Sequence, residues 1–441
     1  MTAPTTAAGP RKRRRAVAGS PLVVLVALLL VLAGCGSGSS GDAANGKVTL
    51  RFSWWGDQVR AAATEKAITA FEAENPKIIV KGEFADFDAY FDRIATSVAA
   101  GKGPDVITMG GAYPREYGDR GALLDLSRVK KELDLSKIDQ AALGNGKFSG
   151  KQYGVPSGVN TYGVVINPAV FKAAGVALPD QDTWTWDDFA RIAAEISKKA
   201  PKGTYGAEDP TTADTLDLFS RQQGESLYTK GGGLAISAQT LTKWWTLTQA
   251  MRDSGATPSA SLTEELVSQT SPEQTLMGRG LAAMRVEWSN QLTALRDASG
   301  KPLELVRAPG ESVGQPGQWL QASQLYTINA RTKHPVEAAK FVNFLVNSTT
   351  AGKIILTDRG IPSNPDVLQG ITPVLTADQK DESAYLARIT KVAGPPLIIG
   401  PTGSTDTPGI LQRLNAEVLF NRDSPPAAAK KFVDEVKAAI A

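Results

Sequence analysis

The chain of 441 residues contains one cysteine and one histidine. A single cysteine excludes an intrachain disulfide, and the two residues together leave no cluster of the kind that binds zinc. A catalytic triad built on histidine would have only His334 to use, and Pro335 directly after it is typical of the first turn of a helix. We therefore interpret His334 as a residue at a helix start, and we expect neither a metal site nor a cofactor.

Apart from a single basic cluster, positive and negative charges in the chain nearly balance. The chain has 48 basic and 45 acidic residues, but residues 11–15 read RKRRR and no acidic residue precedes Asp42. Without that cluster 43 basic residues face 45 acidic ones, so the excess positive charge belongs to the N-terminus. A nucleic-acid-binding domain normally carries this excess on its own folded surface. We do not expect nucleic acid as a partner.

The overall composition is that of a folded protein. The apolar fraction of 42% and the charged fraction of 21% are ordinary for a globular chain, which excludes a disordered chain, collagen and a polytopic membrane protein. The length is sufficient for two or three domain-sized units, each with its own core.

The N-terminus has the pattern of an export signal that ends at the only cysteine. An apolar run, LVVLVALLLVL at 22–32, follows the basic cluster and is too short to span the ~30 Å hydrocarbon core of a bilayer. It ends in LAGC at 32–35, which resembles the bacterial lipobox, whose cysteine receives a diacylglyceryl group. We predict a signal peptide over 1–34, then lipidated Cys35 and a flexible tether over 35–46. The alternative is that Cys35 is incidental.

Strands and helices alternate through the first part of the body. Apolar periodicities predict strands over 48–54, 78–84 and 105–109, with helices over about 58–74 and 87–100. This alternation indicates an α/β domain built from crossover units. Further strands are expected at 281–288, 302–309 and 325–329, and a further helix at 334–347.

Residues 153–167, YGVPSGVNTYGVVIN, break this alternation. Pro156 and Gly158 lie between two extended pieces, which predicts a chain that crosses from one domain to another. TWTWDDF at 183–189 predicts a helix capped by Thr185, and we interpret its tryptophans as structural. Another tryptophan pair, at 244–245 in a helix-like stretch, is assigned to the core or the surface rather than to a site.

Several segments, taken in order, resemble one family: the extracellular solute-binding proteins of ABC importers, particularly the carbohydrate-binding group that includes maltose-binding protein. The segments are FSWWGD at 52–57, AAGKGPDVITM at 99–109, the crossing segment at 153–167, TWTWDDF at 183–189, GLAAMRVEWSNQL at 280–292, EAAKFVNFLVN at 337–347 and DRGIPSN at 358–364. The resemblance covers essentially all of the chain after the tether. Gram-positive members of this family are commonly lipid-anchored.

This resemblance implies two α/β lobes joined by crossing hinge segments, with the ligand in the cleft between them. It places lobe one at roughly 46–155 and 306–347, and lobe two at roughly 160–303 and 350–441. It also implies closure of the lobes around a sugar or an oligosaccharide. We accordingly expect a monomer on the outer face of the cytoplasmic membrane that delivers its ligand to an ABC permease and its ATPase.

A sugar presents apolar C–H faces and a rim of hydroxyls, so its site needs a flat aromatic surface and several hydrogen-bonding groups. Trp54 and Trp55 end the first predicted strand, where neighbouring residues point to opposite faces. We select Trp55 as the aromatic platform. Asp57 and Gln58 follow in the next loop, and Tyr113 follows the third predicted strand, where ligands of open α/β sheets bind.

The remaining candidates come from the second lobe and the hinge. Glu287 and Trp288 occupy the region from which the family's second lobe often stacks an aromatic residue on the sugar. The alternative is that Trp288 packs inside the lobe. Asn160 and Gln324 add polar groups, and Arg359 matches a family loop near the cleft rim unless it forms a surface salt bridge.

Two other functions remain open. A lipid-anchored glycoside hydrolase needs a pair of carboxylates in a cleft, and the 45 acidic residues can supply one, but no segment resembles a hydrolase. The second is a binding protein for a peptide, a polyamine or a phosphorylated polyol. Phosphate capture favours arginine, lysine or a glycine-rich helix start, and the sequence has no clear phosphate loop. We predict a protein that binds a sugar without catalysis.

Overall fold

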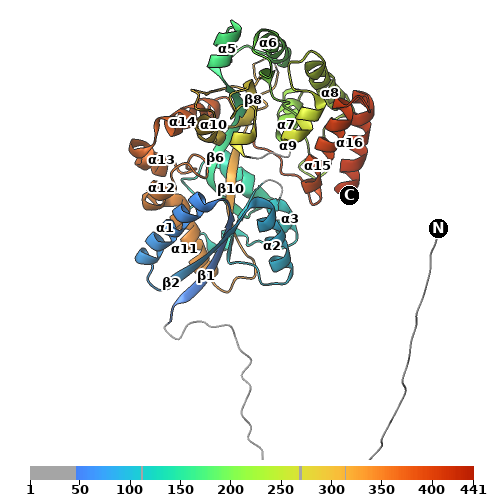
Figure 1. The fold of residues 1–441 in the computed structure, drawn as a ribbon. Coiled ribbons are helices and arrows are strands. Elements are labelled where there is room, and N and C mark those ends of the chain that lie inside the picture. The colour runs from blue at the N-terminus through green and yellow to red at the C-terminus, as the bar shows by residue number, and fades with distance from the viewer. Residues whose placement is uncertain (1–45, 111–112, 268–270, 313) are drawn as a thin grey trace, which may run out of the picture. The chain divides into compact units, whose positions relative to one another are not determined.

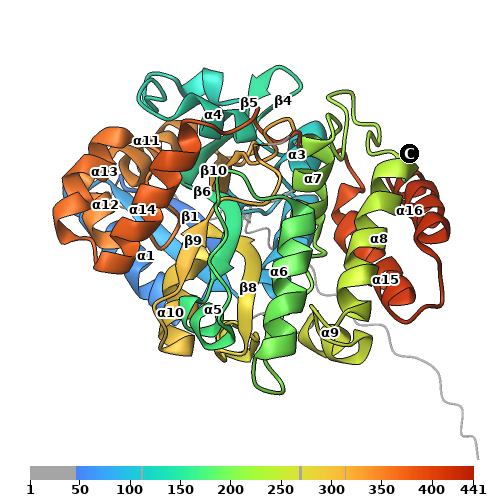
Figure 2. The same cartoon turned by 90° about the horizontal axis from the view of Figure 1, so that it is seen from above.

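The computed structural model describes residues 46–110, 113–267, 271–312 and 314–441. These residues belong to one compact unit, which is drawn in two views (Figures 1 and 2). The expected signal peptide, Cys35 and all but the last residue of the tether lie outside the described residues. No helix in the described part of the chain is long and apolar enough to cross a membrane.

The first lobe is built on three parallel strands, β1 (Val48–Trp55), β2 (Ile78–Ala85) and β3 (Val106–Met109). The helices between them, α1 (Gln58–Glu74) and α2 (Phe87–Ala99), confirm the predicted alternation. Because β1 is the central strand of the three, its apolar side chains form the core. Phe52 is fully buried and packs on Phe341 of α11 (Pro335–Asn347), the helix predicted at 334–347.

Two long strands carry the chain between the lobes (Figure 1). The first part of β6 (Gly154–Ile166) pairs with β10 (Leu320–Ile328). Because β10 also pairs with β3, this part of β6 extends the sheet of the first lobe. From Tyr162 onward β6 pairs with β8 (Ala282–Trp288) and then with β9 (Glu304–Val306), and β7 (Tyr205–Ala207) pairs with β8. The crossing predicted at 153–167 is therefore confirmed.

The tryptophans of both predicted pairs, Trp184 with Trp186 and Trp244 with Trp245, are buried in the core of the second lobe. Their burial confirms that they are structural. Thr185 caps α6 (Trp186–Lys199), as the sequence predicts, and the structure adds a capping box with Asp188. The other helices of this lobe are α5 (Pro168–Ala174), α7 (Ala213–Gln222), α8 (Ala238–Asp253), α9 (Ala260–Val267), α10 (Leu292–Ser299), α15 (Thr407–Leu419) and α16 (Pro425–Ala439).

Two stretches of chain lie with the opposite lobe from the one expected. Helix α12 (Thr349–Ile355) packs against α1 and α11, and α13 (Pro365–Ile371) packs on α12, so this part of the range 350–441 lies with the first lobe. Conversely, Ala308 and Trp319 lie in the second-lobe core, although we expected 306–347 in lobe one. An apolar stripe shows that an element has a buried face, but not which core covers that face.

A third segment also contacts both lobes. Helix α14 (Ala377–Thr390) packs against β6 and β9, and residues 391–406 then lead to α15. Within this segment Ile399 packs with Tyr90 and Met109 of the first lobe, whereas Leu397 and Ile398 pack against the second-lobe core. Three short elements lie between β3 and β6 in the chain: α3 (Tyr113–Asp119), α4 (Gln140–Leu143) and the hairpin of β4 (Lys147–Phe148) with β5 (Lys151–Gln152) (Figure 2).

Candidate ligand-binding site

The two tryptophans at the end of β1 have different environments. Trp54 is fully buried, whereas Trp55 is only partly buried, which follows from the alternation of side chains along a strand. The centroid of the Trp55 ring lies 5.5 Å from that of Phe87, 5.7 Å from that of Tyr90 and 5.5 Å from that of Phe91. Trp55 is therefore held by rings on one side and retains exposed surface.

Tyr113, the first residue of α3, belongs to the same group of rings. It stacks on Phe91 with centroids 3.7 Å apart and an interplanar angle of 9°. Gly110, just after β3, lets the Trp55 ring lie close to the backbone there, because a Cβ at this position would be only 2.9 Å from that ring. We call this group the first-lobe ring cluster: Trp55, Phe87, Tyr90, Phe91 and Tyr113. The structure thus brings together two predicted site residues from the ends of β1 and β3.

Asp57 and Gln58 follow Trp55 on the exposed first turn of α1. The Asp57 carboxylate accepts a hydrogen bond from the backbone N–H of Arg60 at 2.8 Å, so it caps the helix. A carboxylate has more acceptor positions than this one bond uses, and Asp57 is exposed to solvent. Both side chains can therefore accept further hydrogen bonds beside Trp55.

Trp288 ends β8 in the second lobe and is partly buried against the core. Its ring contacts two buried rings edge-to-face: the centroid distance is 4.7 Å to Tyr162 and 5.9 Å to Trp319. We call Tyr162, Trp288 and Trp319 the second-lobe ring cluster. Trp288 therefore packs inside the lobe, as one of the two alternatives has it, and is also partly exposed. Stacking on a sugar stays a prediction.

Glu287 is held by its neighbours in β8. Its carboxylate accepts hydrogen bonds from Arg285 at 2.9 Å and from the backbone N–H of Trp288 at 2.8 Å. Arg285 also forms an ion pair with Glu208 on the adjoining strand end. The carboxylate of Glu287 thus neutralises Arg285 and fixes the backbone of Trp288. Direct contact of Glu287 with a ligand stays a prediction.

Asp214, in the first turn of α7, is an acidic residue at the second-lobe ring cluster that the sequence did not single out. Burial raises the pKa of its carboxyl to about 7, with smaller increases from the negative charges of Asp217 and Glu287. A hydrogen bond with the side chain of Trp288 acts in the opposite direction. This carboxyl therefore changes its charge near neutral pH beside a candidate ligand-stacking ring.

Asn160 and Gln324 lie on the crossing strands β6 and β10, and both are buried. The amide of Asn160 donates to the side-chain oxygen of Asn290 at 2.9 Å. The side-chain oxygens of Asn160 and Gln324 have no hydrogen-bond partner among the described residues. Buried acceptors are normally paired, so these two oxygens are candidates for contacts with ligand hydroxyls or water.

Arg359 is buried in this structure, and its place near the cleft rim stays a prediction. Its side chain is 1% exposed, and its guanidinium donates to the hydroxyls of Tyr326 and Thr64, each at 2.6 Å. Asp358 of the same loop forms an ion pair with Arg60 at 2.9 Å and a longer one with Arg359 at 3.9 Å. A buried guanidinium needs hydrogen-bond partners, and the first lobe supplies them for two of its nitrogens, while Nε has none among the described residues. Arg359 therefore supports the fold of the first lobe, and contact with a ligand stays a prediction.

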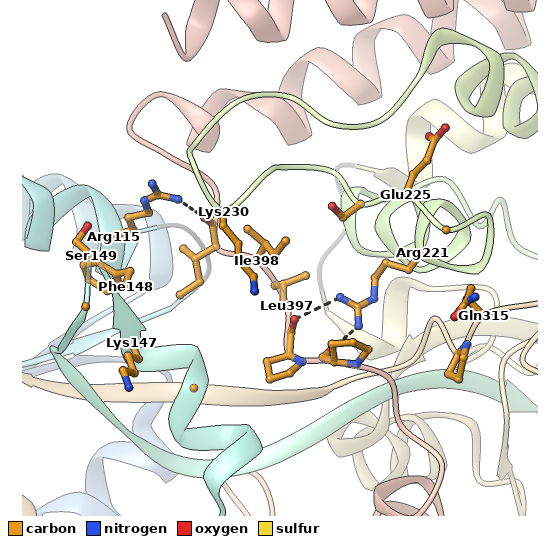
Figure 3. A pocket seen from close by; sticks show the side chains of 18 residues that line it. Arg115, Lys147, Phe148, Ser149, Arg221, Glu225, Lys230, Gln315, Leu397 and Ile398 are labelled. Carbon is orange, nitrogen blue, oxygen red and sulfur yellow. Dashed lines mark hydrogen bonds between the residues drawn. The ribbon is translucent and has the colours of Figure 1, made fainter.

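A cavity of about 890 Å³ lies between the lobes, beside residues 395–399 of the segment that contacts both of them (Figure 3). Its walls come from α3 and the β4–β5 hairpin of the first lobe, and from the end of α7 and the following loop of the second. Residues 395–399 form a third wall. None of the residues that the sequence singled out lines this cavity, because its walls are loops without a distinctive motif.

The sequence contained signals for some of the missed residues. Tyr162 lies within the crossing segment that the sequence identified, and Trp319 directly precedes β10. Aromatic residues make up only 7% of the chain, so each ring near a strand end is notable. Asp214 carries no comparable signal, because one aspartate at a helix start is usually a solvated helix-end charge.

In the described part of the chain, no group of three or more His, Cys, Asp and Glu side chains could hold a metal ion.

A family model described as a bacterial extracellular solute-binding protein matches residues 66–382. The uncharacterized lipoprotein in the oleD 5′ region of Streptomyces antibioticus is 26% identical over 360 residues, which cover 79% of this chain and 77% of that protein.

Two further proteins are similar over most of the chain. The multiple sugar-binding protein of Streptococcus mutans is 25% identical over 389 residues, covering 82% of this chain and 84% of its own. A solved structure of an extracellular solute-binding protein family 1 member from Alicyclobacillus acidocaldarius matches with a TM-score of 0.71 and 29% identity. That match covers 90% of this chain and 100% of the other.

Proposed function

Because the chain belongs to the bacterial extracellular solute-binding protein family, we propose that it captures a sugar or an oligosaccharide between its two lobes and delivers it to an ABC permease. The similarity to a multiple sugar-binding protein supports this class of ligand. The observation that carries the proposal is that each lobe has one partly exposed tryptophan, Trp55 or Trp288, held in a ring cluster. Binding by both requires the lobes to close on one ligand.

The chemistry of the surrounding residues suits a sugar. Trp55 and Trp288 offer flat surfaces to the C–H faces of the ligand, and Tyr113 extends the first of these surfaces. Hydroxyls of the ligand would donate to the unpaired oxygens of Asn160 and Gln324 and to the carboxylate of Asp57. Gln58 and Asp214 are further polar candidates, and Glu287 acts by holding Trp288.

Binding and carbohydrate preference are tested together by calorimetry on residues 47–441. Monosaccharides and oligosaccharides form the main panel, with peptides, polyols and polyamines as controls. A ligand that binds only the folded state stabilises it by ~2.7 kcal/mol at a hundredfold excess over Kd. Stabilisation by a peptide or a polyamine, with none by any saccharide, would show that the solute class is wrong.

The proposal also covers the membrane anchor and the partners. Lipidated Cys35 would hold the protein on the outer face of the cytoplasmic membrane, where it would act as a monomer with a permease and a cytoplasmic ATPase. Cys35→Ala should abolish labelling by a fatty-acid analogue, because the chain has no other thiol. Label that persists on the variant would contradict the anchor.

We further propose that the ligand leaves unchanged. An oligosaccharide recovered after long incubation and denaturation of the protein should have its original length. Shorter products whose formation is lost in Asp214→Asn or Asp57→Asn would instead indicate a hydrolase.

A further inference from the structure

The cavity of Figure 3 is surrounded by four cationic side chains and one carboxylate. The carboxylate, Glu225, does not offset this charge within the cavity. It accepts a hydrogen bond from the backbone N–H of Ser237 at 2.9 Å and points away from the other labelled side chains (Figure 3). The charge that a bound molecule would meet is therefore mainly positive.

The two arginines are already engaged by the protein. Arg115 forms an ion pair with Asp119 at 3.3 Å and donates to the carbonyl of Ile399 at 2.9 Å. Arg221 donates to the carbonyl of Gly317 at 2.9 Å and to that of Pro395. Their donors hold residues 395–399 in place, so few remain to grip a phosphate in the two-pronged manner that arginine favours.

The two lysines have no such partners. Lys147 lies on β4 of the first lobe and Lys230 lies in the loop after α7 of the second, and both are exposed. Neither ammonium group has a hydrogen-bond or ion-pair partner among the described residues. Lys230 extends toward Leu397 at the middle of the cavity (Figure 3). The uncompensated charge thus comes from both lobes.

The remaining wall is apolar. Phe148, Pro395, Pro396, Leu397 and Ile398 line it, and the volume of about 890 Å³ suits a ligand of a few rings. We infer that this cavity binds an acidic saccharide, with uronic-acid carboxylates at Lys147 and Lys230 and C–H faces on the apolar wall. The inference rests on the proposed function, that the chain binds a saccharide, and adds an acidic ligand class at a cavity that Trp55 and Trp288 do not line.

The experiment measures the affinity of the full chain by titration calorimetry. The ligands are trimers of galacturonate, glucuronate, mannuronate and guluronate, the methyl ester of each trimer, and a phosphorylated trisaccharide. Methyl esters keep the shape of the sugar and remove its charge. The variants are Lys230→Gln, Lys147→Gln and the double variant, with Lys81→Gln on β2 as an exposed lysine outside the cavity.

We expect at least one acidic trimer to bind about tenfold more tightly than its ester, and each cavity variant to lose about tenfold for that trimer alone. Lys81→Gln should bind like the wild type. Equal binding of ester and acid, unchanged binding by the double variant, or tightest binding of the phosphorylated sugar would each overturn the inference while leaving carbohydrate binding intact. If no saccharide binds, neutral ones included, the proposed function fails as well.

Discussion

The ring clusters of the two lobes differ in what surrounds them. The first-lobe ring cluster is made of aromatic rings, and its buried Tyr90 hydroxyl donates only to the backbone carbonyls of Ser53 and Thr108. In the second-lobe ring cluster, Trp288 interacts with the carboxyl of Asp214 and is held through its backbone by Glu287. A ligand would therefore meet mainly aromatic rings at the first-lobe ring cluster, and a carboxyl that titrates near neutral pH beside Trp288 in the second.

The largest expected effect distinguishes the two neighbours within the first lobe. Trp54→Ala should lower the free energy of unfolding by ~3–5 kcal/mol, because it removes a fully buried ring from the core. Trp55→Ala should cost clearly less, because its ring is partly exposed. Denaturant unfolding of both variants measures the difference. Equal losses would mean that Trp55 is a core residue and not a platform.

The second prediction tests the titrating character of the second lobe. The pKa of Asp214 is about 7 in the folded protein and ~3.9 in an unfolded chain, so the folded state binds the proton more tightly. The contribution of this carboxyl to stability should therefore increase as pH falls from about 7 toward 4. Relative to Asp214→Asn, the wild type should gain roughly 2–3 kcal/mol between pH 8 and pH 5.

Urea unfolding of both proteins across this range provides the measurement. Burial also raises the pKa of three other carboxyls, those of Asp217, Glu311 and Glu382. They make the stability of both proteins depend on pH, so only the difference between wild type and variant reports on Asp214. Parallel stability curves for the two proteins would show that Asp214 titrates normally.

The third prediction concerns affinity. Trp55→Ala and Trp288→Ala should each weaken saccharide binding by ~2 kcal/mol, or about thirtyfold in Kd, because each removes one aromatic contact. Trp244→Ala, which changes a ring buried in the second-lobe core, is the matched control and should reduce stability rather than the affinity of the folded protein. If only one of the two site variants binds weakly, then only that lobe contributes a stacking surface.

The smallest expected effect separates capping from binding at Asp57. Asp57→Ala should cost ~1 kcal/mol of stability through the lost cap of α1, whereas Asp57→Ser should keep most of it. If Asp57 also accepts a ligand hydroxyl, the serine variant should bind more weakly despite its retained stability. Thermal unfolding and calorimetry on the same samples measure both quantities. Wild-type affinity in Asp57→Ser would restrict Asp57 to its structural role.

The local elements of the fold could be predicted because their patterns are local. The alternation of β1 separated Trp54 from Trp55, and Thr185 as a capping residue located the start of α6. The site could be predicted only in part. A strand-end position pointed to Trp55 and the family resemblance to Trp288. The burial of Arg359 was not foreseen, because a loop motif does not reveal whether its arginine is buried.

The sequence by itself determined where strands and helices form, where the chain crosses between lobes and which rings end the strands, since these depend on residues a few positions apart. Only the tertiary structure decided which lobe covers α12 and the residues before β10, and that Trp288 lies against Asp214. It also decided that 395–399 form a wall beside Lys147 and Lys230. These features join residues more than seventy positions apart, and no local pattern encodes such contacts.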